Sequence, residues 1–196
     1  HFDYLTIPTS DAIPAYIPLI PKEKIQIIPQ AFNMRNVQLA PTPTGDVPTF
    51  AYAGVFYQDI RNPEFLFQHL CTLTKDFLFH VYLRHRDPYT TSLLNRYQQI
   101  LGEKLVVHYS IKRTELLYQL SQCHFLINIS NTTSTQLPSK LIDYGITQRP
   151  IYSFDKQSFE PQVFELFMHG DYSNAMAIDI HPYDIEVVTQ QFLELV

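Results

Sequence analysis

Glycine is scarce in this chain: only five of its 196 residues are glycine, and no two of them lie close together in the sequence. The dinucleotide-binding fingerprint and the P-loop both need clustered glycines, so both motifs are excluded. A phosphate ligand would therefore have to be bound by helix N-termini and cationic side chains.

Cysteines are also few, and long apolar runs are missing. Cys71 and Cys123 make neither a disulfide framework nor a spaced metal motif, and we interpret both as buried thiols. No run approaches the roughly 18–20 apolar residues of a membrane-spanning helix, and no signal segment opens the chain. The sequence begins at His1, and we treat it as a piece of a longer protein.

Positive charge is not in excess. The net charge is −5 and 17% of the residues are charged, which argues against a broad basic surface for nucleic acid. The composition is 45% hydrophobic, as in globular proteins, and the length suits little more than one domain.

Proline divides the chain in two. Eight of the fourteen prolines lie in the first 48 residues, where only the run from Ile25 to Ile28 resembles a strand. Residues 42–46 read as a linker or turn. We interpret residues 1–45 as the end of an N-terminal domain and an interdomain linker, and residues 46–196 as one domain.

From residue 47 onward, short apolar runs alternate with helical patterns. This alternation is typical of an α/β fold, a Rossmann-like, doubly wound parallel sheet with helices on both faces. About six strands are predicted, at residues 49–53, 77–83, 105–109, 124–129, 150–154 and 175–180. Helices are predicted at residues 63–73, 88–101, 113–121, 138–146, 159–168 and 183–195.

The cations are unevenly placed in this scheme. Ligands of such sheets bind outside the carboxyl ends of the strands. Three cations fall on helix-to-strand connections, whereas six of the fourteen fall on strand-to-helix connections: Arg61, Arg84, Arg86, Lys112, Arg113 and Lys140. Surface loops are generally polar, which explains part of this asymmetry. The alternative explanation is an anionic ligand that these cations bind.

Lys140 and Arg61 carry a sharper argument. Pro138 suits the first position of a helix, which puts Lys140 in the first turn, and Asn62 suits the cap of another helix beside Arg61. A cation at the positive end of a helix is unfavourable by about 0.3–1 kcal/mol. Either side chain can avoid this cost by pointing into solvent. A phosphate between the two helix starts would instead stabilise both cations.

Asp143 lies one helical turn beyond Lys140 and on the same face. Two interpretations remain open for its carboxylate: an ion pair with Lys140, or hydrogen bonds to the ribose hydroxyls of a nucleotide. Leu141 and Tyr144 are expected in the core.

The histidines suggest no catalytic centre. His80, His108 and His124 lie in predicted strands and are expected to be buried and hydrogen-bonded. His85, at a strand end, is a weaker candidate for ligand contact. No metal-binding spacing and no nucleophile motif is present in the sequence.

Two segments of the chain resemble a known family. The sequence INISN at 127–131 and QLPSKLIDY at 136–144 are similar to the IN-x-x-N and Q-x-P-S-K-x-x-E-Y signature of bacterial glycosyltransferases that build polysaccharides such as capsule. The runs at 25–32, 50–54, 60–63 and 149–151 give weaker support. The resemblance implies that the chain is the C-terminal half of a GT-B fold.

The resemblance also implies roles for individual residues. Lys140 and Arg61 would hold the diphosphate of a nucleotide-sugar, together with the helix amides at Ser139 and Lys140. Asp143 stands where the family has a ribose-binding glutamate. Asn131 and Gln136 would border the phosphates or the sugar, and residues 109–112 would meet the base. Thr135 replaces the second glutamate of many retaining members, so a retaining outcome is not implied.

The implied function is sugar transfer from a nucleoside diphosphate donor to a saccharide or lipid-linked acceptor. No metal or other cofactor is expected, since this family generally needs none. The catalytic residues would lie in an N-terminal domain that this chain lacks, so the fragment alone is expected to be inactive. The parent is expected in the cytoplasm, at the inner membrane face. A nucleotide-sugar 2-epimerase and a non-catalytic α/β interaction module remain alternatives.

Overall fold

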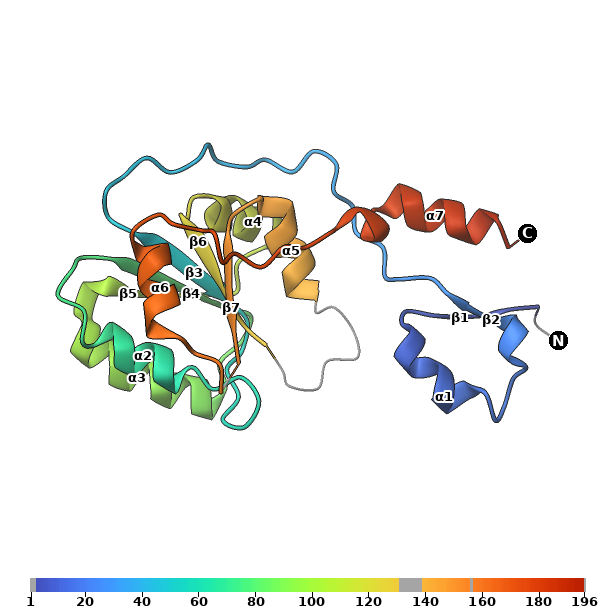
Figure 1. The fold of residues 1–196 in the computed structure, drawn as a ribbon, viewed down its shortest axis with the longest axis horizontal. Helices are drawn as coiled ribbons and strands as arrows, with labels where there is room; N and C mark the ends of the chain where they lie inside the picture. Colours follow the sequence, from blue (N-terminus) through green and yellow to red (C-terminus); the bar gives the residue numbers. More distant parts are fainter. Residues whose placement is uncertain (1–2, 131–138, 156, 196) are drawn as a thin grey trace.

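A parallel sheet lies at the centre of the larger part of the molecule, between two layers of helices (Figure 1). The computed structural model describes residues 3–130, 139–155 and 157–195. Within them the sheet has the strand order β5-β4-β3-β6-β7 and every pairing is parallel. The order reverses between β3 and β6, which makes the sheet doubly wound and confirms the predicted fold class. The strands are β3 (Thr49–Ala53), β4 (Leu78–Leu83), β5 (Leu105–Tyr109), β6 (Phe125–Ile129) and β7 (Ile151–Phe154).

Helices cover both faces of this sheet (Figure 1). One face carries α2 (Glu64–Leu70), α3 (Pro88–Leu101) and α6 (Pro161–Met168). The other face carries α4 (Arg113–Ser121) and α5 (Ser139–Thr147). Short 3-10 turns lie at Ser10–Ala12, Lys22–Lys24, Gly102–Lys104 and His181–Tyr183.

The alternation of side chains along β3 explains the two different cores. Phe50 and Tyr52 face α2, α3 and α6, whereas Ala51 and Ala53 face α4 and α5. The Phe50 ring stacks on two rings of the neighbouring strands, each 4.9 Å away between centroids: Phe79 and Phe125. Large rings thus fill one core, while small alanines leave room on the other face for the helices that border the site.

Helix starts follow the capping residues of the sequence. Asp87 accepts a hydrogen bond from the Thr90 amide at 2.9 Å, and α3 begins at Pro88 as predicted. Asn62 accepts one from the Glu64 amide at 2.9 Å. The N-cap position of α2 is occupied by Pro63 rather than Asn62, so α2 begins at Glu64, one residue later than expected.

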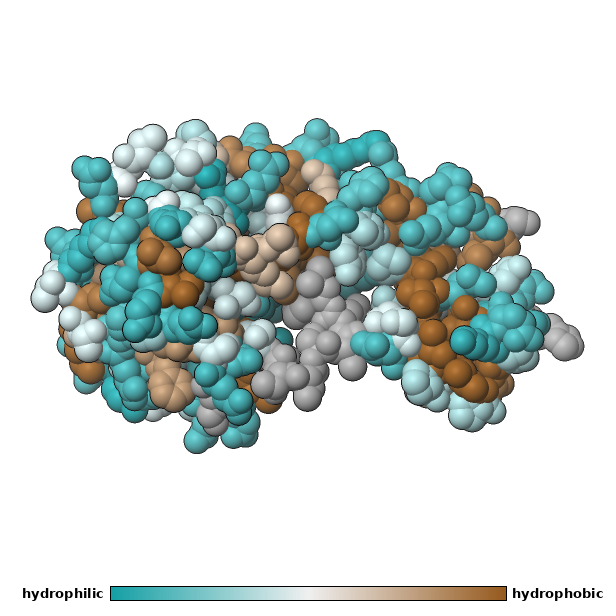
Figure 2. All heavy atoms as spheres, viewed as in Figure 1, coloured by the Kyte–Doolittle hydropathy of each residue, from teal (hydrophilic) through white to brown (hydrophobic). Residues whose placement is uncertain are grey.

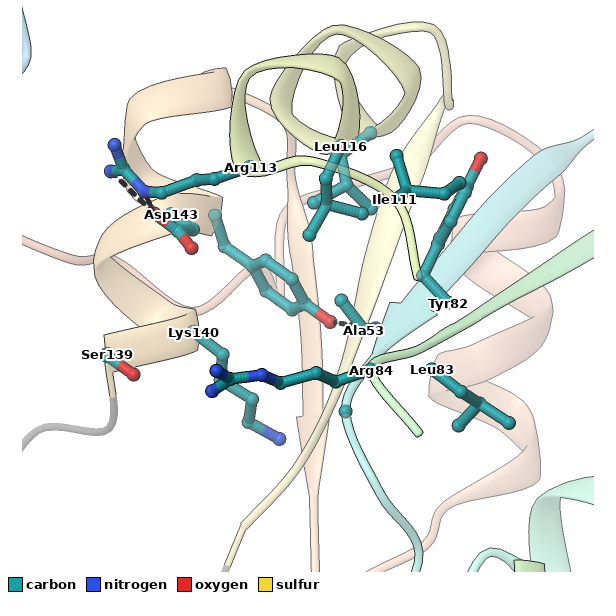
Figure 3. Close-up of a pocket in the computed structure, with 13 residues that line it drawn as sticks. Ala53, Tyr82, Leu83, Arg84, Ile111, Arg113, Leu116, Ser139, Lys140 and Asp143 are labelled. Atoms are coloured by element: carbon teal, nitrogen blue, oxygen red, sulfur yellow. Dashed lines mark hydrogen bonds and ion pairs between the residues drawn. The ribbon is translucent and has the colours of Figure 1, made fainter. Parts of the chain in front are cut away.

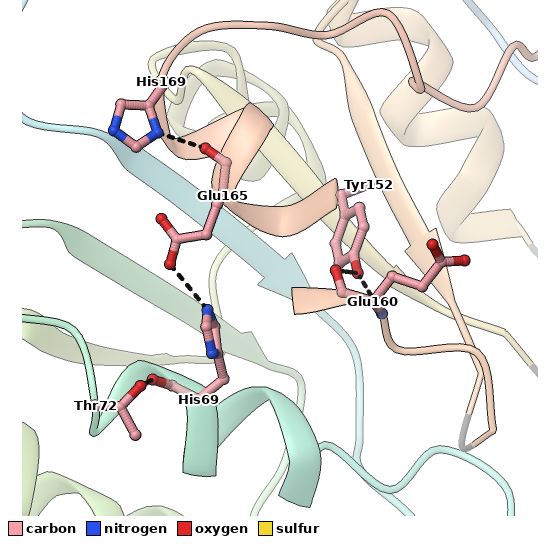
Figure 4. A network of polar contacts seen from close by, with 6 residues as sticks. All are labelled: His69, Thr72, Tyr152, Glu160, Glu165 and His169. Carbon is pink, nitrogen blue, oxygen red and sulfur yellow. Dashed lines mark hydrogen bonds and ion pairs between the residues drawn. The ribbon is translucent and has the colours of Figure 1, made fainter. Parts of the chain in front are cut away.

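A polar contact joins α2 to α6 on the face that holds the aromatic core (Figure 4). His69 Nε2 lies 3.1 Å from Glu165 Oε1, and the His69 ring meets the Phe164 ring edge-on. The same imidazole therefore contributes both a polar and an aromatic contact to the packing of the two helices.

The strand histidines are hydrogen-bonded, as expected. His80 Nδ1 lies 3.0 Å from His108 Nε2 across β4 and β5, and the His108 ring stacks on Tyr82. Burial lowers the pKa of both imidazoles. His124 Nδ1 accepts a hydrogen bond from the Thr49 amide, and His124 Nε2 donates one to the Gly45 carbonyl, each at 3.0 Å.

The predicted strand at residues 175–180 is wrong, because the structure has no strand there. Met176, Ile178 and Ile180 alternate as in a strand, but they pack against the layer of α4 and α5. Ile180 comes so close to α5 that a Cβ atom on Gly145 would lie 2.3 Å from its Cγ2. The apolar side chains are therefore buried by helix contacts, while a single backbone hydrogen bond, from the Met176 amide to the Ile151 carbonyl at 2.9 Å, reaches the edge strand β7.

Residues before the linker form a small unit of their own beside the C-terminal helix α7 (Ile185–Leu193) (Figure 1). Its parallel strands β1 (Leu5–Ile7) and β2 (Ile25–Ile27) are connected through α1 (Ile13–Tyr16). Figure 2 shows apolar side chains on the surface of this unit. Leu19, which belongs to the same unit, is 77% exposed. A two-stranded unit of this kind has little core, and its assignment to an N-terminal domain stays a prediction.

Residues 32–37, which follow the small unit, contact the start of α7 and the turn before it. Phe32 exchanges backbone hydrogen bonds with Tyr183 and Ile185, of 2.8 and 3.0 Å. Residues Phe32, Met34 and Val37 also contact the buried side chains of Ile142 and Ile146. Residues 32–37 therefore pass over α5, which also borders the candidate site.

Candidate functional site: a cleft at the carboxyl end of the sheet

A cleft of about 460 Å³ opens at the carboxyl ends of β3 and β4 (Figure 3). It lies beside β3, where the strand order reverses, and this is the place where open α/β sheets bind ligands. The helix side of the cleft is formed by α4 and α5. Its polar and charged lining residues are Tyr82, Arg84, Arg113, Ser139, Lys140, Asp143 and Tyr144.

Lys140, in the first turn of α5, points back toward the sheet. Its Nζ donates a hydrogen bond to the Ile129 carbonyl at 3.2 Å and lies 4.9 Å from the centre of the Tyr52 ring. Burial, with the positive charge of Arg61 as a further cause, lowers the pKa of Lys140 to about 7. In the described part of the chain no carboxylate pairs with this amine. An anion in the cleft would stabilise its charged form.

Arg61 approaches Lys140 from the loop between β3 and α2. Burial raises the pKa of Tyr52, and the charge of Arg61 and its hydrogen bond to the Tyr52 side chain oppose this shift. The guanidinium also lies 5.8 Å from the Tyr57 ring. The structure therefore brings the two predicted cations together, although Arg61 itself is not part of the cleft lining.

Asp143 pairs with Arg113, the first residue of α4. Arg113 Nη2 and Nε lie 2.7 and 2.9 Å from Asp143 Oδ1. The Asp143 side chain is 18% exposed; burial raises its pKa, and Arg113 opposes that shift. The ion pair with Lys140, one of the two interpretations of the sequence, is therefore replaced by a pair with a residue from the neighbouring helix. Both contacts go to Oδ1, so Oδ2 is the oxygen that a ligand would meet.

The remaining predicted residues have mixed outcomes. Ser139 is exposed, lines the cleft and is the first described residue of α5. Asn131, Gln136 and Pro138 lie outside the described residues. His85 is exposed and does not line the cleft.

Two cleft residues, Arg84 and Arg113, were not singled out from the sequence. Both follow strands that end at this edge of the sheet, β4 and β5, and they were noted only among the cations of strand-to-helix connections. The position of Arg84 and Arg113 on those connections is the feature of the sequence that indicates a place at this edge of the sheet. Their proximity to α5 depends on the order of strands and on helix packing.

Tyr144 fixes α5 against the end of β3. Its hydroxyl oxygen accepts a hydrogen bond from the Ala53 amide at 2.7 Å, and its side chain is fully buried, as expected. The helix that carries Lys140 and Asp143 is thereby held in register with the cleft.

Replacing Tyr144 with phenylalanine is expected to lower the free energy of unfolding by about 1–3 kcal/mol, because the buried Ala53 amide would lose its acceptor. Urea unfolding measures this loss. Tyr118→Phe, on the exposed side of α4, is the matched control and should change stability by less than about 0.5 kcal/mol. Equal effects of the two substitutions would contradict the role given to the Tyr144 hydroxyl.

Among residues 3–130, 139–155 and 157–195, no three His, Cys, Asp or Glu side chains gather as a metal site would require. In the same ranges, no helix has both the length and the apolar character needed to cross a bilayer.

No protein-family model matches the chain, and no curated protein sequence matches it. Solved structures do. HepE from Anabaena, in complex with UDP-glucose, superposes with a TM-score of 0.66 at 12% identity, over 98% of this chain and 63% of HepE. The lipopolysaccharide outer core galactosyltransferase WaaB gives a TM-score of 0.63 at 14% identity, over 98% of this chain and 61% of WaaB.

The chain has the doubly wound fold of one half of a GT-B protein. A third similar structure, the pneumococcal O-GlcNAc transferase GtfA in complex with UDP and GlcNAc, gives a TM-score of 0.58 at 12% identity, over 98% of this chain and 44% of GtfA. The chain thus spans about three fifths of the length of HepE and WaaB. At identities this low, the similarity of the structures establishes the fold alone. This fold agrees with the one that the resemblance implies.

Proposed function

We propose that this chain is the nucleotide-sugar-binding domain of a glycosyltransferase. The observation that carries the proposal is the buried amine of Lys140 at the start of α5, beside Arg61 and in a cleft at the reversal of strand order. A diphosphate is the ligand chemistry that satisfies two neighbouring cations and the amides of a helix start. The similar structures HepE and GtfA, which hold UDP-glucose and UDP, support the same reading.

The nucleotide would lie across the cleft. Lys140 and Arg61 bind the diphosphate with the first amides of α5, at Ser139 and Lys140. Asp143 Oδ2 accepts from the ribose hydroxyls, while Arg113 keeps the carboxylate oriented. The base lies near Ile111, which also lines the cleft. Asn131 and Gln136 border the phosphates or the sugar in this proposal.

The chemistry of this domain is electrostatic. When the bond between sugar and diphosphate breaks, negative charge develops on the leaving phosphate oxygen. Fixed cations and helix amides aimed at that oxygen stabilise the charge. Lys140 and Arg61 provide these cations, so we propose that transfer needs no metal or other cofactor.

The acceptor and the catalytic residues belong to the rest of the protein in this account. We propose a saccharide or lipid-linked acceptor, a role in bacterial polysaccharide formation such as capsule, and a cytoplasmic parent at the inner face of the membrane. The signature at 127–131 and 136–144 supports these points. The chain alone would bind nucleotide and catalyse no transfer.

A thermal-shift panel with UDP, GDP, ADP, CMP and TDP tests the proposal. A ligand at about 100 times its dissociation constant adds about 2.7 kcal/mol, which corresponds to several degrees in Tm for a chain of this size. Inorganic phosphate at the same ionic strength is the control and should shift Tm far less. If no nucleotide shifts Tm up to millimolar concentration, the proposal is wrong and a non-catalytic interaction module becomes the better account.

A further inference from the structure

Arg84 lies directly after the last residue of β4 and lines the cleft from the side opposite α5. Figure 3 shows its guanidinium pointing across the cleft toward Ser139 and Lys140. The residue thus belongs to the wall that faces the proposed diphosphate, although neither its sequence context nor the resemblance assigns it a role.

The backbone of Arg84 is held by the neighbouring strand. Ser110 Oγ donates to the Arg84 carbonyl at 3.3 Å, and the Ser110 amide donates to the Leu83 carbonyl at 3.0 Å. Ser110 has a φ of 55°, a left-handed conformation that is uncommon for a side-chain-bearing residue. These contacts fix the point from which the Arg84 side chain enters the cleft.

The side chain itself is exposed and carries no ion pair in the described part of the chain. Asp143, the carboxylate of the same cleft, is already paired with Arg113. The second arginine of this loop, Arg86, has a different position, with its guanidinium 4.5 Å from the centre of the Tyr109 ring. Of the two arginines, Arg84 is the one that lines the cleft with its charge left uncompensated.

We propose that Arg84 contacts the second phosphoryl group of the donor diphosphate from the sheet side, opposite Lys140, and thereby selects nucleoside diphosphates over monophosphates. This inference rests on the proposed function. A guanidinium presents two parallel N–H groups to a phosphoryl group, which suits a rigid position at the end of a strand. A monophosphate held by Lys140 and Asp143 would place no phosphoryl group in front of Arg84.

Calorimetric titration of UDP and UMP into three proteins tests this role: wild type, Arg84→Gln and Arg86→Gln. Both variants lose one positive charge from the same loop, so the second controls for the long-range field. Arg84→Gln is expected to weaken UDP binding about 10- to 30-fold and UMP binding less than about threefold. Arg86→Gln should change either affinity less than about threefold.

Two results would overturn the inference. One is an equal loss of UDP affinity in both variants; the other is an equal loss of UDP and UMP affinity in Arg84→Gln. The Tm values of the three proteins should agree within about 2 °C, because the Arg84 and Arg86 side chains are both exposed. If wild type binds UDP and loses it in Lys140→Met but not in Arg84→Gln, only this inference fails. If wild type binds no nucleotide of the panel, the proposed function fails as well.

Discussion

Replacing Lys140 with methionine is expected to weaken nucleoside diphosphate binding by about 10- to 150-fold, or 1.5–3 kcal/mol, because a charge-assisted hydrogen bond to phosphate is lost. The same change should raise the free energy of unfolding. Burial lowers the pKa of Lys140 to about 7, far below that of a free lysine. The folded protein therefore bears the full cost of this burial below pH 7, and the cost disappears only as the pH rises toward the pKa of a free lysine. Methionine keeps the apolar stem over Tyr52 and removes the charge. Calorimetry and urea unfolding measure the two effects.

Lys22→Met is the matched control for this prediction. Lys22 is exposed in the 3-10 turn at Lys22–Lys24 and does not line the cleft, so its loss should leave both nucleotide affinity and stability nearly unchanged. If Lys140 serves binding at the expense of stability, its replacement should lower the nucleotide affinity and raise the free energy of unfolding. If Lys140→Met instead lowers stability and leaves affinity unchanged, Lys140 has a structural role and the nucleotide-sugar assignment of this cleft is wrong.

The second large effect concerns pH. Lys140 is about half protonated near pH 7 in the free protein, and a bound diphosphate favours the ammonium, so its pKa rises on binding. Affinity is therefore full below pH 7 and declines as the pH rises from about 7 toward the pKa of the complex. The cationic groups around this amine are Arg61, which lies beside it, and Arg84 and Arg113, which line the cleft. Burial raises the pKa of the Tyr52 phenol, so this group is further from titrating near neutral pH than a free tyrosine.

Proton uptake gives a direct measurement of this linkage. A nucleoside-diphosphate sugar should be used, because its diphosphate does not titrate near neutral pH. Titration at about pH 7.5 in buffers of different ionisation enthalpy should reveal uptake of a fraction of one proton in the wild type. Lys140→Arg, which stays charged, should show none. Binding without proton uptake in the wild type would contradict the assigned state of Lys140.

Much of the fold was predictable, because the strands are short apolar runs between clear helix starts. The pair Asp87 and Pro88 begins α3 as predicted, and the bounds of α4 are the predicted ones. The strand predicted at residues 175–180 is wrong for a physical reason. Alternating apolar residues indicate burial on one side, and here that side is a helix with a glycine at the contact, which periodicity does not distinguish from a strand.

The site was predictable only in its local part. Lys140 and Arg61 were found because a cation at a helix start is unfavourable without an anion, and the structure brings them together. The partner of Asp143 was not found, since Arg113 lies 30 residues away and reaches it through the packing of α4 on α5. Arg84 likewise enters the cleft through the strand order. The sequence pattern places such residues at one edge of the sheet and does not specify which of them meet.

The central claim is that a nucleoside diphosphate binds at the start of α5, and amide chemical shifts of the ¹⁵N-labelled protein test it most directly. On titration with the nucleotide that gives the largest thermal shift, or with UDP if none does, we expect saturable shifts concentrated at the amides of Gly54, Arg84, Ile111 and residues 139–144. The amides of α6, on the opposite face of the sheet, should stay in place. Shifts centred elsewhere, or none at millimolar nucleotide, would contradict the account.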